Sequence, residues 1–278
     1  MNLSAMSLKA KIRNLSKQTN IKAQVLLQNY MFERFLERLS LSEYKDKFVL
    51  KGGVLISAIV GIDARSTMDL DTTVRGLSLT EENIKYTVSA ICEIPINDGV
   101  MLSFISVGLI RADDIYGGYR AKIIATYDTI ETPFSVDIST GDVITPNAVK
   151  YILSGILNEE KKIELWAYNI ETVLAEKIET ILRRGILNTR TRDYYDIYIL
   201  STTQNYDAVL LKEAITATAV HRGTTGQIAD IQFILNQIAN SDDLKRMWEK
   251  YRQEFNYASE LQYSQVIKAL NDICTVLT

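Results

Sequence analysis

The sequence has little of what several classes of protein require. Its 278 residues include one histidine, His221, and two cysteines, Cys92 and Cys274. A disulfide scaffold or a structural zinc cluster needs more cysteine, and a metal site built from several histidines is excluded. Any Ser-His-Asp chemistry would depend on His221 alone. Both cysteines stand among apolar residues in helical patterns, so we expect buried thiols.

Proline, glycine, long apolar runs and net charge are also scarce. Three prolines and 13 glycines exclude a collagen-like or linker-rich chain. No run of 18 apolar residues predicts a membrane span, and the first 25 residues hold no apolar stretch of signal-peptide length. We therefore expect a soluble, cytoplasmic protein with no membrane partner. The net charge of −3 gives no bulk positive field, so a nucleic acid would need a local basic patch.

What the sequence does have is a mixed first half and a helical second half. Apolar periodicity predicts helices and strands up to about residue 140, the strands lying over 48–50, 68–74, 100–109, 119–127 and 134–138. Beyond Pro146 helical spacing dominates, over 170–184, 191–200, 207–220, 225–239, 241–255 and 259–277. We expect an α+β domain with basic N-terminal helices over 1–150 and an all-helical domain over 151–278.

Charge is concentrated at the start of the chain. Residues 1–51 hold ten lysines or arginines and four acids, a net charge of +6. One interpretation is that these are solvated helix faces. The other is a patch that follows the phosphates of a nucleic-acid substrate.

Three aspartates in predicted strands form the most informative pattern. Asp69 and Asp71 are two residues apart, so on a strand they share one face. Asp137 lies between the apolar residues Val136 and Ile138, and an acid in a central strand is costly unless it is paired or metal-bound. Such a set can hold Mg²⁺ against a triphosphate, as in phosphoryl or nucleotidyl transfer. An Asp-X-Asp pair alone could equally be a solvent-facing edge or a turn.

Two short segments beside the Asp-X-Asp pair could bind phosphate. Gly52 and Gly53 form a turn whose backbone amides could approach phosphate oxygens, and Lys51 could add a positive charge. Arg65 and Ser66 could hydrogen-bond phosphate or could simply cap the loop before the second strand.

The helical half supplies a lysine and two further acids. Lys177 falls at the edge of the apolar stripe of 170–184, where it either snorkels to solvent or reaches a nucleoside triphosphate. Asp193 and Asp196 share one face of the next helix with Arg190. Arg190 could pair with Asp193, or one of the two acids could accept the proton of an attacking hydroxyl.

These segments together resemble the AbiEii/AbiGii toxin family. The resemblance extends over about residues 47–200 and rests on an ordered set of segments: Lys51-Gly52-Gly53, Arg65-Ser66-Thr67, Asp69-Leu70-Asp71, Val136-Asp137-Ile138, Ala175-Glu176-Lys177 and the run from Arg190 to Asp196. It implies a polymerase-β-like nucleotidyltransferase fold followed by a helical domain. Two departures stand out, because 15 residues separate Gly53 from Asp69 and Val54 takes the place of the usual hydroxyl residue.

The resemblance also implies a function, partners and residue roles. The protein would be the toxin of a type IV toxin–antitoxin, phage abortive-infection system, with a cognate AbiEi-type repressor encoded beside it. It would use Mg²⁺ and NTP to add nucleotides to an RNA such as the tRNA acceptor end. Asp69 and Asp71 would be metal ligands, Lys177 would bind triphosphate, and Asp193 or Asp196 would be the essential acid. Asp137 as a third metal ligand follows from the general fold.

Two other functions remain open at this stage. The same fold could serve a non-catalytic protein that binds a nucleotide or a partner, which Val54 and the long spacer would suit. The same carboxylates could also serve a two-metal nuclease.

Overall fold

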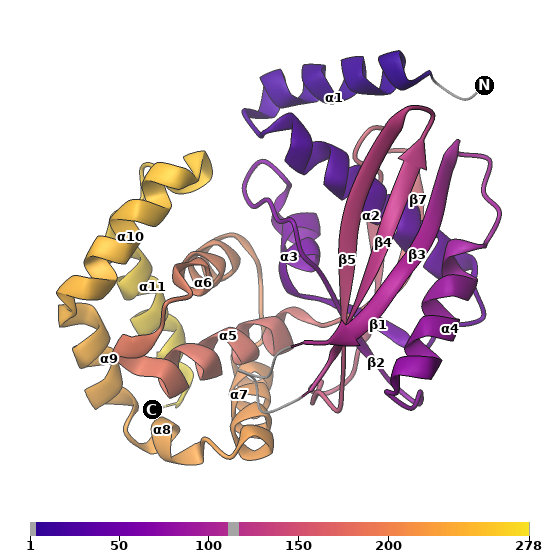
Figure 1. Cartoon of the computed structure of the whole chain (residues 1–278). Helices are drawn as coiled ribbons and strands as arrows, with labels where there is room; N and C mark the ends of the chain where they lie inside the picture. The colour runs from indigo at the N-terminus through magenta and orange to yellow at the C-terminus, as the bar shows by residue number, and fades with distance from the viewer. Residues whose placement is uncertain (1–3, 111–116, 278) are drawn as a thin grey trace. The chain divides into compact units, whose positions relative to one another are not determined.

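The computed structural model describes residues 4–110 and 117–277 and divides them into two compact units (Figure 1). The first unit comprises Met1–Asp142 and Val149–Ala167 and holds the sheet. The second comprises Val143–Ala148 and Tyr168–Thr278 and is helical. This division differs from the one expected at residue 150, because two further strands, over 149–154 and 162–167, hydrogen-bond into the sheet.

The sheet unit is built on seven strands in the order β3-β4-β5-β2-β1-β7-β6. Their bounds are β1 (Phe48–Lys51), β2 (Leu70–Val74), β3 (Val100–Leu109), β4 (Tyr119–Tyr127), β5 (Ile130–Thr140), β6 (Val149–Ser154) and β7 (Lys162–Ala167). The pairs β2–β5 and β1–β7 are parallel, whereas the other neighbouring strands are antiparallel. The sheet is therefore mixed, as the α+β expectation requires.

Helices cover one face of this sheet. The sheet unit contains α1 (Ala5–Thr19), α2 (Ala23–Leu41), α3 (Gly52–Val60) and α4 (Glu81–Cys92). Along β4 and β5 the side chains alternate, and the buried set packs beneath α2 and α4 (Figure 1). Phe134 of β5, for example, meets Phe32 and Phe35 of α2 edge to face. The alternate residues of these strands, Asp137 among them, project from the opposite face.

The helical unit consists of short helices with polar N-caps. It contains α5 (Ile170–Arg184), α6 (Thr191–Thr203), α7 (Ala208–Arg222), α8 (Thr225–Ala229), α9 (Ile231–Asn240), α10 (Asp242–Glu254) and α11 (Tyr263–Cys274), with single 3₁₀ turns at Gly185–Leu187, Asn256–Ala258 and Thr275–Leu277. Asn169 caps α5 by accepting a hydrogen bond from the backbone of Thr172. Tyr194 and Tyr195 are buried, and both cysteines are buried as the sequence predicts.

Two expectations about secondary structure were wrong. The strands β6 and β7 stand where only a helical domain was expected, although Ile163, Leu165 and Ala167 are buried in strict alternation along β7. The helix predicted over 225–239 is two helices, α8 and α9, which meet at Asp230.

Candidate active site

A row of charged residues crosses the four central strands of the sheet unit. The strand register places Lys51 of β1 opposite Asp71 of β2, Asp71 beside Asp137 of β5, and Asp137 opposite Arg120 of β4. Residues paired in this way project from the same face of a sheet. The structure thus brings Asp71 and Asp137 together, although 65 residues separate them in the sequence, and it adds a cation at each end of the row.

The second aspartate of the predicted pair lies against the start of a helix. Helix α3 begins at Gly52, which has a φ of +66°, and a Cβ atom there would fall 2.1 Å from Oδ2 of Asp71. Only glycine accommodates both this backbone conformation and this approach. The carboxylate is therefore held at the positive end of the helix dipole. Asp69 precedes β2 by one residue and is exposed.

The third predicted aspartate is held by an arginine. The Arg120 guanidinium donates from Nε to Oδ1 of Asp137 and from Nη2 to Oδ2, both at 2.7 Å. This hydrogen bonding, and the charges of Asp137, Asp69 and Asp71, raise the pKa of Arg120 above its usual value. The guanidinium therefore lies within the field of all three aspartates.

Lys51 has a partner at the end of the row. Its Nζ atom lies 2.5 Å from Oδ2 of Asp142, and that same oxygen accepts a hydrogen bond of 2.8 Å from the Ser139 hydroxyl. Asp142 lies two residues beyond the end of β5, so the lysine links β1 to the chain that leaves β5. In this arrangement Lys51 adds positive charge beside Asp71, but it is committed to an ion pair.

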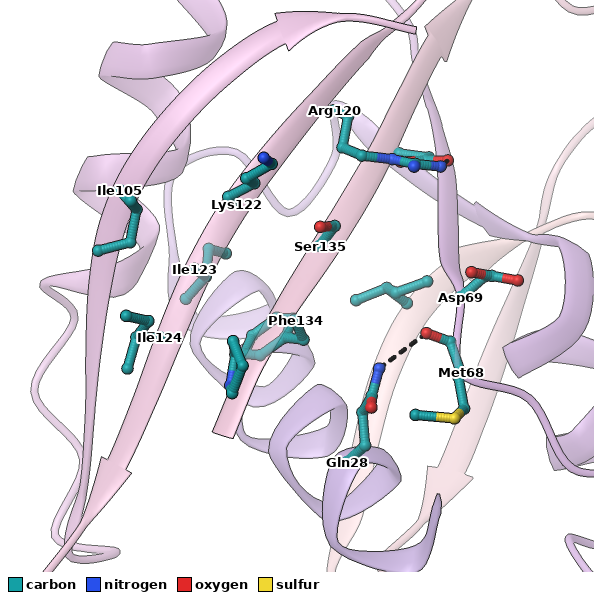
Figure 2. A pocket seen from close by; sticks show the side chains of 13 residues that line it. Gln28, Met68, Asp69, Ile105, Arg120, Lys122, Ile123, Ile124, Phe134 and Ser135 are labelled. Carbon is teal, nitrogen blue, oxygen red and sulfur yellow. Dashed lines mark hydrogen bonds and ion pairs between the residues drawn. The ribbon is translucent and has the colours of Figure 1, made fainter. Parts of the chain in front are cut away.

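A pocket of about 350 Å³ opens beside the aspartates (Figure 2). It lies between β4, β5 and the segment that leads into β2, and Gln28 of α2 donates a hydrogen bond to the Met68 carbonyl within it. Figure 2 shows the Arg120 side chain reaching across β5 toward the segment that carries Asp69. The pocket thus joins charged groups at one end to apolar side chains at the other, among them Met68, Ile105 and Phe134.

Arg65, one of the two residues before β2 that were predicted to bind phosphate, makes contacts within its own loop. Arg65 is buried, and its guanidinium donates to the carbonyl of Ser66. Thr67 packs against Gly53, where a Cβ atom would lie 2.6 Å from its hydroxyl, and that hydroxyl accepts from the backbone amide of Asp69. These contacts favour the loop-capping interpretation of Arg65, since they fix the segment that positions Asp69.

The donor chemistry of this face fits Mg²⁺ in part. Asp69 and Asp71 offer hard oxygen ligands from neighbouring positions, and Gly52 presents no side chain against Asp71. Within residues 4–110 and 117–277, however, no three acidic, histidine or cysteine side chains stand where they could share one ion. Both oxygens of Asp137 accept from Arg120. Asp69 and Asp71 are therefore the residues that would hold a cation, and Asp137 stays a predicted third ligand.

In the helical unit, the structure joins the predicted lysine to both predicted acids. Nζ of Lys177 on α5 lies 2.6 Å from Oδ1 of Asp193 and 2.7 Å from Oδ2 of Asp196, both on α6. Nε of Arg190 lies 3.0 Å from Oδ2 of Asp193, which is the pairing that the sequence offered as one of two alternatives. Burial alone would lower the pKa of Lys177, but the two aspartates outweigh burial and raise it. The lysine is thus charged and partly buried, with two buried carboxylates as partners.

A second ionic cluster ties α7 to α5. Arg222 contacts Glu176 at 2.9 Å and Glu179 at 2.6 Å, and Glu179 also accepts from Thr224. Arg222 therefore has a structural role here, since it links the end of α7 to α5. Glu179 is buried within this cluster.

The basic start of the chain separates into two groups. Arg34 and Arg38 of α2 are buried, and Arg38 makes two hydrogen bonds to Asp98 at 2.8 and 3.1 Å. Exposed lysines and arginines, by contrast, lie along α1, just after it and just before β1: Lys9, Lys11, Arg13, Lys17, Lys22, Lys45 and Lys47. Only this second group could follow phosphates, and it remains open to either interpretation.

Sequence reasoning missed Arg120 and Asp142. Arg120 alternates with buried residues in β4, which marks it as a residue of the exposed face, but nothing in the sequence fixes which strand lies beside it. Asp142 lies 91 positions from Lys51, so only the folded sheet reveals the pair.

Comparison with solved structures identifies the class of fold. The protein JHP933 from Helicobacter pylori has 14% identity and a TM-score of 0.54, covering 92% of this chain and 93% of its own. A provisionally described nucleotidyltransferase from H. pylori has 14% identity and a TM-score of 0.52, covering 92% and 96%. The mixed sheet followed by helices is thus a nucleotidyltransferase-like fold.

The family follows from the sequence itself. Residues 34–273 match the family described as nucleotidyl transferase AbiEii toxin of type IV toxin–antitoxin systems, and the chain belongs to that family. Membership in a toxin–antitoxin family implies an antitoxin partner. No curated protein matches the sequence. Among the residues that the structure describes, no helix has the length and apolar character needed to cross a bilayer.

Proposed function

We propose that this AbiEii-family toxin is a Mg²⁺-dependent nucleotidyltransferase that binds NTP and transfers nucleotides to an RNA, with the tRNA 3′ end as the favoured acceptor. The observation that carries the proposal is the row of Lys51, Asp71, Asp137 and Arg120, with Asp69 two residues before Asp71. A nucleotidyl transfer needs carboxylates that hold a divalent cation, with cationic side chains nearby, because negative charge builds up on the phosphate oxygens as the bond to pyrophosphate breaks.

The residues of the sheet unit have separate tasks in this proposal. Asp69 and Asp71 would hold the cation, which when bound neutralises the triphosphate and supports attack by the acceptor hydroxyl. Gly52 and Gly53 at the start of α3 place backbone amides where phosphate oxygens can approach, and Lys51 adds positive charge beside them. Asp137 would act as the third carboxylate.

The helical unit contributes the lysine and its two acids. Lys177 would bind the triphosphate, and Asp193 or Asp196 would be the essential acid, as the family resemblance implies. In the structure the three side chains neutralise one another in part, since one lysine and Arg190 face two carboxylates. A triphosphate that recruits Lys177 would free a carboxylate to accept a proton. The cognate antitoxin is proposed to be an AbiEi-type repressor encoded nearby, and the cytoplasm is the proposed location.

The proposal is tested by transfer of α-³²P-labelled NTP to total tRNA in the presence of Mg²⁺. We expect labelled RNA with the wild type and at least about a hundredfold less with Asp69→Ala. Glu131→Gln is the matched control, because Glu131 is exposed on β5 and six residues from Asp137, so it shares the same face of the strand.

The same assay separates the other two functions. A nuclease would shorten end-labelled RNA when NTP is omitted. A non-catalytic nucleotide-binding protein would bind NTP and Mg²⁺ in a calorimeter yet label neither RNA nor protein. Unchanged transfer by Asp69→Ala would remove the proposed metal site.

A further inference from the structure

Arg120 forms an ion pair with Asp137, the carboxylate that is predicted as the third ligand of the proposed metal site. Its guanidinium binds Asp137 through two parallel hydrogen bonds, so both oxygens of that side chain are engaged. The two residues are direct partners across the antiparallel pair β4–β5, so their side chains project side by side from the same face of the sheet. The arginine thus supplies the positive charge beside Asp137, and with this pair closed no three carboxylates of the described residues stand where they could share one ion.

The ion pair between Arg120 and Asp137 is placed where it can break. The Arg120 side chain is 49% exposed and lines the pocket rather than the core, so it can move without disturbing packed residues. Such a pair is weaker than a fully buried one, since water screens it at its exposed side and the long side chain gains freedom on release. The buried pair of Arg38 and Asp98 in the same unit has no such freedom.

We propose that Arg120 is an internal counter-ion that competes with the divalent cation for Asp137. The cation would then gain its third carboxylate ligand only when the ion pair between Arg120 and Asp137 breaks. This inference rests on the proposed function and names a positioning residue for it. Once released, Arg120 lies beside Lys122, two residues along the same face of β4. The two cations would then face the pocket and the phosphate groups of the substrate.

The inference makes a prediction that needs no turnover. Binding of Mn²⁺, followed by the electron paramagnetic resonance signal of the free ion, measures the affinity of the aspartates directly. We expect Arg120→Gln to tighten Mn²⁺ binding about two- to fivefold, the change expected when a half-exposed ion pair no longer has to be broken. Arg120→Lys keeps the charge but not the paired hydrogen bonds, so its gain should be smaller and in the same direction.

Two matched variants separate direct competition from a general effect of charge. Lys122→Gln removes a positive charge from the same strand and face without touching Asp137, and it should tighten binding less than Arg120→Gln. In an Asp137→Asn background, Arg120→Gln should bring no further gain, because the contested carboxylate is gone. Thermal unfolding without Mn²⁺ checks that each variant is folded.

The outcomes distinguish this inference from the proposed function. If wild type binds Mn²⁺, Asp69→Ala abolishes binding and Arg120→Gln leaves it unchanged or weaker, the metal site stands and the counter-ion role is overturned. An equal gain from Lys122→Gln, or a gain that persists in the Asp137→Asn background, overturns it as well. If neither wild type nor Arg120→Gln binds Mn²⁺, both the metal site and the inference fail. Tighter binding that depends on Asp137 supports the inference.

Discussion

At the scale of single residues, the molecule uses the same chemical groups in two different settings. Aspartates on the sheet stand at the protein surface beside a half-exposed arginine, whereas Asp193 and Asp196 in the helical unit are buried around Lys177. Removing one partner of a buried ion pair destabilises the fold, because the remaining charge is left buried without a counter-ion. The two sites should therefore respond very differently to substitution.

Replacing Lys177 tests this contrast. We expect Lys177→Met to lower the free energy of unfolding by about 3–5 kcal/mol, since two buried carboxylates lose their shared cation. The triple variant Lys177→Met, Asp193→Asn, Asp196→Asn should recover most of that loss, because no buried charge is left. Chemical denaturation monitored by circular dichroism gives both values, and a Lys177→Met variant as stable as wild type would exclude the buried cluster.

The same lysine should make stability depend on alkaline pH. The aspartates raise the pKa of Lys177 in the folded protein above its ordinary value of 10.5. Because the folded-state pKa exceeds that of the unfolded chain, the stabilisation is complete below that ordinary value and is lost as pH rises through the folded-state value. We expect wild type to lose more stability than Lys177→Met between pH 9 and pH 12, measured by urea denaturation. Parallel losses in the two proteins would contradict this assignment.

At the scale of elements, the site depends on how β1 turns into α3 beside β2. The positive φ of Gly52 starts the helix at the residue whose Cα atom faces the Asp71 carboxylate. The strand register then sets Asp71 beside Asp137. Turn and register together decide where the carboxylates lie.

Gly52→Ala tests the turn. The added Cβ atom would meet Asp71 at 2.1 Å, and the left-handed backbone adds a cost of about 1–2 kcal/mol. We expect a folded protein whose nucleotide transfer falls about a hundredfold, because a carboxylate displaced by an ångström no longer serves the reaction. Gly108→Ala in β3 is the control, since its Cβ atom would meet nothing within 4 Å. Wild-type transfer by Gly52→Ala would show that the position of Asp71 is unimportant.

Much of this architecture could be predicted from the sequence, and the failures have physical causes. Alternation in 119–127 and helical spacing in 170–184 predicted β4 and α5 with the bounds that the structure has. The strand β7 was missed although it alternates, because its six residues follow a short polar turn and precede a strongly helical region. Arg120 could not be assigned, because the partner of an exposed residue on a strand depends on strand order, which local patterns do not specify.

At the scale of the whole molecule, each unit has its own buried core and its own buried thiol. Cys92 lies in α4 of the sheet unit and Cys274 in α11 of the helical unit. Burial raises the pKa of each thiol to about 12. Neither should form much thiolate near neutral pH, so the two cysteines report on the opening of their own units.

Thiol labelling exploits this arrangement. We expect a thiol-specific reagent at pH 8 to modify native protein at least about a hundredfold more slowly than unfolded protein, because both the pKa and burial suppress the thiolate. With increasing urea, mass spectrometry of the labelled peptides should give separate midpoints for Cys92 and Cys274, as expected of two compact units with separate cores. One shared midpoint would mean that the two units unfold as a single cooperative block.

The central claim is that the aspartates of the sheet carry nucleotide transfer, and one comparison tests it most directly. Labelled NTP is incubated with tRNA, Mg²⁺ and either wild type, Asp71→Asn or Glu131→Gln, each at matched concentration and with matched folding by circular dichroism. We predict labelled RNA from wild type and Glu131→Gln and a loss of at least about a hundredfold with Asp71→Asn. Equal labelling by Asp71→Asn and wild type would contradict the account.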